Sequence, residues 1–167
     1  GFTLIELLVV VAIIGILAAV GVVAYNGYTG AAKKNAAKTI HANLIKYVAA
    51  EYSKCTIDDS DTIMKKGGAG GIACSSTNDA GAIEFVTAGE IVTHLTGTDT
   101  PLEDKNPYST ASAAVRSSTS AGAGFVSITA TSDNLITVLT CFTDGKTGNE
   151  CTDTGNQLTL SLIHISE

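Results

Sequence analysis

The feature that most constrains this chain is an unbroken apolar run from Leu7 to Ala24, directly preceded by Glu6. Eighteen apolar residues are close to the minimum that an α-helix needs to cross the hydrocarbon core of a bilayer. Glu6 is the only formally charged side chain among the first 32 residues. A carboxylate in such a helix costs about 2.5–3.5 kcal/mol at the bilayer centre and less near the interface. We therefore expect Glu6 to have a specific positive partner and to mark a functional site.

The string GFTLIELLVVVAIIGILAA, residues 1–19, resembles the processing site and N-terminal helix of type IV pilins and their relatives, the pseudopilins. The resemblance covers about the first 30 residues, and the rest of the chain matches the family only in architecture. It implies that a prepilin peptidase cuts between Gly1 and Phe2 and that the new amino group of Phe2 is methylated. It also implies that Glu6 guides assembly by pairing with the Phe2 amine of a neighbouring subunit. A secretory signal peptide and a plain single-pass anchor are the alternatives, and the FTLIE prefix favours a pilin.

The absence of proline from Phe2 to Ser53 predicts one continuous helix of about 52 residues, about 78 Å long. The second half of this helix carries apolar residues at three- and four-residue steps, which is the pattern of an amphipathic helix. The residues of this stripe are Ile40, Leu44, Tyr47, Val48 and the pair Glu51 and Tyr52. We expect the stripe to pack on a sheet formed by the later residues.

The apolar half of the helix forms the filament core in the assembly that the resemblance implies. The residues assigned to this core are Leu7, Val11, Ile14, Gly15, Leu17 and Gly21. The glycines have two interpretations, close helix–helix contact in the membrane or local unwinding in the filament, as the family allows. Val22 and Val23 stand where many relatives carry a proline, which weakens the second interpretation, and both remain open.

Two features disagree about the orientation of the helix. Lys33, Lys34 and Lys38 follow the apolar run, and the positive-inside rule places that end in the cytoplasm. The four cysteines of the following domain indicate an oxidising compartment outside. We follow the cysteines, because the resemblance supplies an explanation: prepilin leaders carry orienting basic residues that processing removes.

The chain divides into four parts. Residues 1–30 form the hydrophobic helix that serves as membrane anchor and filament core, and residues 31–54 form its amphipathic half. Residues 55–123 form an irregular region, and residues 124–167 form an antiparallel sheet with a C-terminal disulfide loop.

The irregular region contains one predicted helix, at Ala88–Thr96. Pro101–Tyr108 contains Asn-Pro and predicts turns. Ala111–Ala123 is rich in Ser, Ala and Thr, and we expect it to be exposed coil.

Three runs rich in β-branched residues, Phe125–Thr131, Leu135–Thr143 and Gln157–Ser166, predict an antiparallel meander. One face of such a sheet needs a cover, which the helix stripe provides. The predicted fold class is therefore α+β, a long N-terminal helix packed on a three- to four-stranded antiparallel sheet, as in the type IV pilin fold. The ending SLIHISE resembles translated sequencing-adapter sequence, and no role is assigned to its residues.

Four cysteines allow three pairings. The sequence-local pairing, Cys55–Cys74 and Cys141–Cys151, closes two short loops and crosses no secondary element, and we predict it. A disulfide at Cys141–Cys151 also matches where pilins often carry one near the C-terminus. A zinc site is disfavoured because no CxxC spacing occurs.

Composition argues against several functional classes. The net charge of −6 and a pI of about 4.9 disfavour nucleic-acid binding, which needs basic residues. His41, His94 and His164 are scattered, and no GxSxG, HExxH or P-loop string occurs. We therefore expect no enzyme, no metal and no cofactor, and we expect His41 to be interfacial.

Two acidic loops carry oxygen ligands that Ca²⁺ prefers, although neither matches EF-hand spacing. Their residues are Asp58, Asp59 and Asp61 in the first loop and Asp144, Asn149, Glu150 and Asp153 in the second. We expect both loops to be solvated.

The resemblance implies a structural protein, the major subunit of a type IV pilus, with adhesion, twitching motility or DNA uptake as properties of the filament. The alternative is a pseudopilin of a type II secretion system, and a membrane-anchored module that does not assemble is a third. Two cysteine pairs and the absence of a tryptophan-bearing calcium loop favour the pilin. The implied partners are further copies of the chain, the prepilin peptidase and the pilus assembly machinery. The implied locations are the inner membrane before assembly and the bacterial cell surface afterwards.

Overall fold

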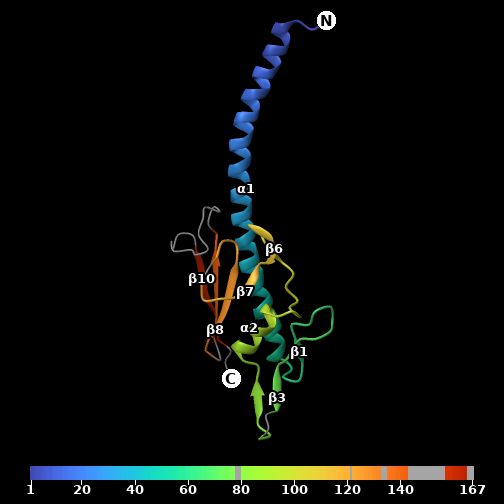
Figure 1. Cartoon of the computed structure of the whole chain (residues 1–167). Coiled ribbons are helices and arrows are strands. Elements are labelled where there is room, and N and C mark those ends of the chain that lie inside the picture. The colour runs from blue at the N-terminus through green and yellow to red at the C-terminus, as the bar shows by residue number, and fades with distance from the viewer. Residues whose placement is uncertain (78–79, 121, 133–134, 143–156, 165–167) are drawn as a thin grey trace.

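A long helix and a small domain built around its second half make up the structure, a computed structural model that describes residues 1–77, 80–120, 122–132, 135–142 and 157–164 (Figure 1). The elements in chain order are α1 (Leu4–Cys55), β1 (Thr62–Ile63), β2 (Ile72–Ala73), β3 (Ser75–Thr77), β4 (Ile83–Phe85), α2 (Ala88–Thr96), β5 (Lys105–Asn106), β6 (Ser109–Ala113), β7 (Val115–Ser117), β8 (Val126–Ser132), β9 (Leu135–Cys141) and β10 (Gln157–His164). The predicted α+β class is confirmed.

Helix α1 runs without interruption for 52 residues, as the absence of proline predicts. Its buried residues are Ala37, His41, Leu44 and Val48, which follow one another at three- and four-residue steps. The other predicted stripe members, Ile40, Tyr47 and Tyr52, are partly buried at the margins of the same core. Only the second half of α1 therefore belongs to the domain, and the first half projects from it (Figure 1).

The main sheet has four strands in the order β10-β9-β8-β7. The predicted antiparallel meander is confirmed, because β9 pairs antiparallel with both β8 and β10. The fourth strand differs from expectation, since β7 pairs parallel with β8, with Val115 opposite Val126. The connection between them is short for a parallel pair. It is held in place where Arg116 and Ser127 both donate hydrogen bonds to the Ser120 carbonyl.

The prediction of exposed coil for Ala111–Ala123 is wrong, because β6 and β7 occupy part of this range. Ala114 and Val115 are buried, which the sequence did not indicate because Val115 is the only large apolar residue in this segment. The predicted turn segment Pro101–Tyr108 also contributes the short strand β5, which pairs with β6. The helix predicted at Ala88–Thr96 is present with those bounds as α2.

The core lies between α1, α2 and the main sheet. Helix α2 contributes four buried residues, Ala88, Ile91, Val92 and Leu95. Alternate residues of β8 and β9 join the same cluster, namely Val126, Ile128, Ile136 and Val138. From the sequence we expected α1 alone to pack against the sheet. In the structure, α2 also packs against β7, β8 and β9.

One polar contact crosses the interface between α1 and the sheet. His41, 6% exposed, is joined by a 2.7 Å hydrogen bond from its Nδ1 to Oγ1 of the fully buried Thr140 on β9. This confirms that His41 is interfacial. Burial lowers the pKa of His41 below its ordinary value of 6.5, because desolvation disfavours the charged imidazolium.

A second polar contact fixes the chain that follows α1. Oε2 of Glu51 accepts a 2.7 Å hydrogen bond from the backbone N–H of Met64, and the Met64 carbonyl accepts one of 3.0 Å from Nε2 of His94 on α2. Burial alone would raise the pKa of Glu51, but the hydrogen bonds from Lys54 and Met64 outweigh burial and lower this pKa. Met64 is fully buried with φ 58°, a left-handed conformation that a side chain rarely adopts. The two hydrogen bonds hold it there.

The predicted disulfide Cys55–Cys74 is present and ties the end of α1 to the segment between β2 and β3. Its Cα atoms are 5.2 Å apart, within the usual range for a disulfide. In the second predicted pair, Cys141 is buried at the end of β9, and Cys151 lies outside the described residues. The Cys141–Cys151 pairing therefore stays a prediction.

We expect the free energy of unfolding to decrease as the pH falls through about 6.5, because unfolded His41 binds a proton more tightly than buried His41. Urea denaturation in detergent micelles at about pH 7.5 and about pH 5 measures this change. The lowered pKa of Glu51 acts only at more acidic pH. The control is His41→Gln, which keeps a polar side chain but cannot titrate. A pH dependence that persists unchanged in this variant would contradict the assignment to His41.

Replacing both Cys55 and Cys74 by serine should lower the free energy of unfolding by about 3 kcal/mol, because the denatured chain loses a short closed loop. Urea denaturation of the double variant measures the loss, and peptide mapping without reductant identifies the pairs. A crosslinked peptide joining Cys55 to Cys151, or Cys74 to Cys141, would show that the pairing is wrong.

Candidate functional site

The part of α1 that projects from the domain forms a long apolar arm, which we define as residues 1–28. Every residue of this arm is exposed, and the first buried residue of α1 is Ala37. Phe2 is 88% exposed and Val23 is 74% exposed. By length and composition the helix can cross a membrane. No described residue outside α1 covers this surface.

The residues predicted to form the filament core all lie on the arm. Leu7, Val11, Ile14, Leu17 and Gly21 recur at three- and four-residue steps and so share one face of the helix. The four large side chains among them are each more than half exposed. Their role as a filament core stays a prediction.

The predicted glycines of the core have free space around them. A Cβ atom built on Gly15 or Gly21 would meet no atom within 4 Å. Packing inside the subunit therefore does not require glycine at either position, although glycine weakens a helix by about 1 kcal/mol relative to alanine. Both interpretations, close helix contact and unwinding in the filament, place the reason for these glycines outside the single subunit.

Glu6 lies in the first turn of α1 and forms a reciprocal capping box with Thr3. Oγ1 of Thr3 accepts a hydrogen bond from the Glu6 N–H, at 3.4 Å. Oε2 of Glu6 accepts from the Thr3 N–H at 2.8 Å and from the Thr3 hydroxyl at 2.7 Å. The carboxylate also lies at the positive end of the helix dipole. Within the subunit, Glu6 is thus held by dipoles of its own helix.

Thr3 is the residue that the sequence analysis missed. The spacing Thr-x-x-Glu before an apolar run is the sequence pattern of a capping box, and Thr3 and Glu6 match it. An apolar depression of about 370 Å³ lies beside the box, lined by Phe2, Ile5, Glu6, Val9 and Val10. The carboxylate therefore borders exposed apolar surface.

Comparison with known families concerns this same arm. A sequence model of the prokaryotic N-terminal methylation motif matches residues 1–22. The chain carries the type IV pilin and pseudopilin signature. No solved structure matches the chain. The long N-terminal helix followed by antiparallel strands is consistent with the pilin fold.

The pilin signature also indicates how the chain is processed and assembled. It implies processing by a prepilin peptidase and assembly into filaments. The motif and the apolar arm fit a membrane-anchored precursor. Proteins with this signature are structural subunits and not enzymes.

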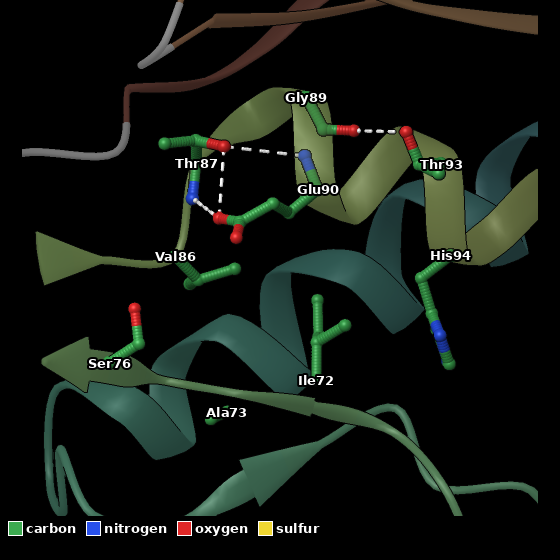
Figure 2. A pocket seen from close by; sticks show the side chains of 9 residues that line it. All are labelled: Ile72, Ala73, Ser76, Val86, Thr87, Gly89, Glu90, Thr93 and His94. Carbon is green, nitrogen blue, oxygen red and sulfur yellow. Dashed lines mark hydrogen bonds between the residues drawn. The ribbon is translucent and has the colours of Figure 1, made fainter. Parts of the chain in front are cut away.

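A further depression, of about 560 Å³, lies between the N-terminal end of α2 and strands β2 and β3 (Figure 2). Four of its polar side chains have partners inside the protein. Thr87 and Glu90 form the capping box of α2, and Thr93 donates to the Gly89 carbonyl. His94 donates to Met64. The hydrogen bonds of these four side chains therefore lie within the protein and stabilise the fold.

In the described part of the chain, no three His, Cys, Asp or Glu side chains gather to form a metal site, so the first acidic loop does not form one. In the first loop, Oδ1 of Asp58 accepts hydrogen bonds from the N–H and hydroxyl of Ser60. The second candidate loop, residues 144–153, lies outside the described residues.

We expect filament subunits to begin at Phe2 with one methyl group on the amino nitrogen, because the resemblance of the Gly1-Phe2 junction to pilin processing sites implies cleavage after Gly1. Intact-mass spectrometry of purified filaments measures both changes, and fragmentation locates the methyl group. A subunit that retains Gly1 would contradict this prediction.

Proposed function

We propose that this chain is the major subunit of an extracellular type IV pilus and that it polymerises through its apolar arm. Adhesion, twitching motility or DNA uptake would then be properties of the filament. The observation that carries the proposal is the arm itself, since residues 1–28 are exposed along their whole length.

The cost of exposing the arm to water supplies the driving force for polymerisation. In the inner membrane, lipid satisfies the run from Leu7 to Ala24. In water, each exposed side chain costs about 25 cal/mol per Å² of apolar surface, so extraction from the membrane requires another cover. Other copies of the same helix provide it when they pack side by side with an axial offset. A head-to-tail contact of this kind generates an open helical filament instead of a closed ring.

Glu6 gives the packed helices their register in this proposal. Within a bundle, the Glu6 carboxylate is removed from water and needs a positive partner. The methylated amine of Phe2 in a neighbouring subunit is the positive group that processing creates at the same end of the helix. The capping box already points the carboxylate toward the N-terminal end of the helix.

A pseudopilin of a type II secretion system is the alternative, because the methylation motif is shared by both groups. The cysteines favour the pilin, since a disulfide at Cys55–Cys74 and a predicted one at Cys141–Cys151 stabilise a domain exposed outside the cell. Electron microscopy of sheared surface material distinguishes the two. Long filaments containing this chain identify a pilus.

The charge of Glu6 and its capping role can be separated by substitution. Glu6→Gln keeps a capping-box residue but removes the charge, and we expect it to abolish filaments, since an unpaired buried amine costs about 3–5 kcal/mol per subunit. Thr3→Ala removes the cap at about 1 kcal/mol and keeps the charge, so filaments should persist. The measurement is filament yield by electron microscopy, with membrane insertion checked for each variant. Normal filaments in Glu6→Gln would refute the pairing.

A truncation tests whether the arm as a whole is needed for polymerisation. Removing residues 2–31 leaves the buried part of α1, from Ala37 onward, in place. The truncated domain should be a soluble monomer with the Cys55–Cys74 disulfide intact. Filaments formed by this truncated domain would show that the arm is not the polymerising element.

A further inference from the structure

Three lysines, Lys33, Lys34 and Lys38, lie where α1 enters the globular domain. Nζ of Lys33 lies 5.7 Å from the ring centroid of Tyr108. Nζ of Lys34 and of Lys38 lie 5.1 Å and 4.8 Å from the centroid of Phe142. Two aromatic rings of the domain therefore hold these ammonium groups where α1 enters it. Among the described residues, none of the three lysines forms a salt bridge.

The charge of the chain is strongly asymmetric. Residues 1–50 contain four lysines and a single acidic residue, Glu6. The rest of the chain contains six basic and fifteen acidic residues. A positive collar thus separates the apolar arm from an acidic domain, and the acidic domain does not supply the partner of this collar among the described residues.

Two tyrosines lie between the apolar run and the lysines. Tyr25 is 68% exposed and Tyr28 is 75% exposed, so neither packs on the domain. Exposed tyrosines at the end of a membrane helix are typical of the interfacial layer. Residues from Leu4 to Ala24 span about 31 Å along the helix, which matches the hydrocarbon core of a bilayer.

The positions of Ala24 and the two tyrosines determine where the lysines lie relative to the membrane. With Ala24 at the edge of the hydrocarbon core, Tyr25 and Tyr28 occupy the headgroup layer. Lys33 lies about 14 Å beyond Ala24 along the helix, within about a Debye length of the lipid phosphates once its side chain extends. Lys46 lies about 20 Å further along α1 and is too distant to reach them.

We propose that Lys33 and Lys34, with Lys38 as a weaker third group, bind anionic phospholipid headgroups on the outer face of the inner membrane. The aromatic rings hold the lysine side chains in the free subunit, and at the membrane Lys33 and Lys34 extend from the rings so that their N–H donors reach phosphate oxygens. The acidic domain faces away from the membrane and is repelled by it, so the collar holds the subunit at a fixed depth and orientation. This inference rests on the membrane stage of the proposed function and not on polymerisation.

Lipid selectivity of the full-length chain tests the proposal. The chain is reconstituted in phosphatidylcholine vesicles with a trace of spin-labelled phosphatidylglycerol or spin-labelled phosphatidylcholine. Electron paramagnetic resonance then measures the motionally restricted fraction of each lipid. We expect at least about a twofold excess of restricted phosphatidylglycerol, falling toward equality at high salt. The variant Lys33→Gln/Lys34→Gln should bring the ratio close to one.

The matched control is Lys65→Gln/Lys66→Gln, which removes the same charge near the far end of α1, beside the Met64 contact with Glu51. It should keep the wild-type ratio. Circular dichroism checks that each variant folds, and the salt dependence of the wild-type chain provides a test that needs no variant.

Three results would overturn the proposal. Equal restriction of both lipids by the inserted wild-type chain excludes anionic headgroup binding. An unchanged ratio in Lys33→Gln/Lys34→Gln, together with lost filaments, would assign the collar to an acidic surface of a neighbouring subunit instead. A chain that restricts neither lipid is not inserted, which would overturn the membrane stage of the proposed function as well. Failure of polymerisation alone leaves the lipid ratio unaffected, so the two proposals fail separately.

Discussion

The structure depends on the burial of one short stripe of α1 against the main sheet and α2. Leu44 and Val48 join the side chains of β8 and β9 in a single core, and His41 adds a hydrogen bond to Thr140 at the same interface. Because the arm, residues 1–28, makes none of these contacts, it extends from the domain as an uninterrupted helix from Leu4 onward. The fold thus holds the apolar arm in a defined direction without covering any of it.

The arm passes through two environments in the proposed life of the subunit, lipid and the interior of a filament. Both are apolar, so the same sequence suits both. The charged groups mark the two ends of this segment, with Glu6 at the start and the lysine collar after Tyr28. Each end has a local partner in the single subunit, Thr3 for the carboxylate and aromatic rings for the lysines. These local contacts satisfy the charges until an external partner replaces or supplements them.

The globular domain has a small apolar core, and a disulfide and a few hydrogen bonds help to hold it together. The disulfide Cys55–Cys74 and the hydrogen bonds of Glu51 and His94 to Met64 tie the segment after α1 to both helices. The two-residue strands β1 and β2 could not persist alone. The disulfide and the hydrogen bonds hold β1 and β2 in position. The main sheet and α2 supply most of the core.

The sequence alone determined the elements whose signal is local and periodic. The proline-free stretch gave the length of α1, the alternation in β8, β9 and β10 gave the meander, and Ala88–Thr96 gave α2 with its bounds. The FTLIE string pointed to the methylation motif, which the match to residues 1–22 supports. What only the tertiary structure decided depends on contacts between distant segments. Strand β7 is a strand because it pairs with β8, and Met64 adopts its unusual conformation because Glu51 and His94 hold its backbone. The lysine collar likewise gains its rigid position from Tyr108 and Phe142, residues that are far away in the sequence and that no local pattern connects to α1.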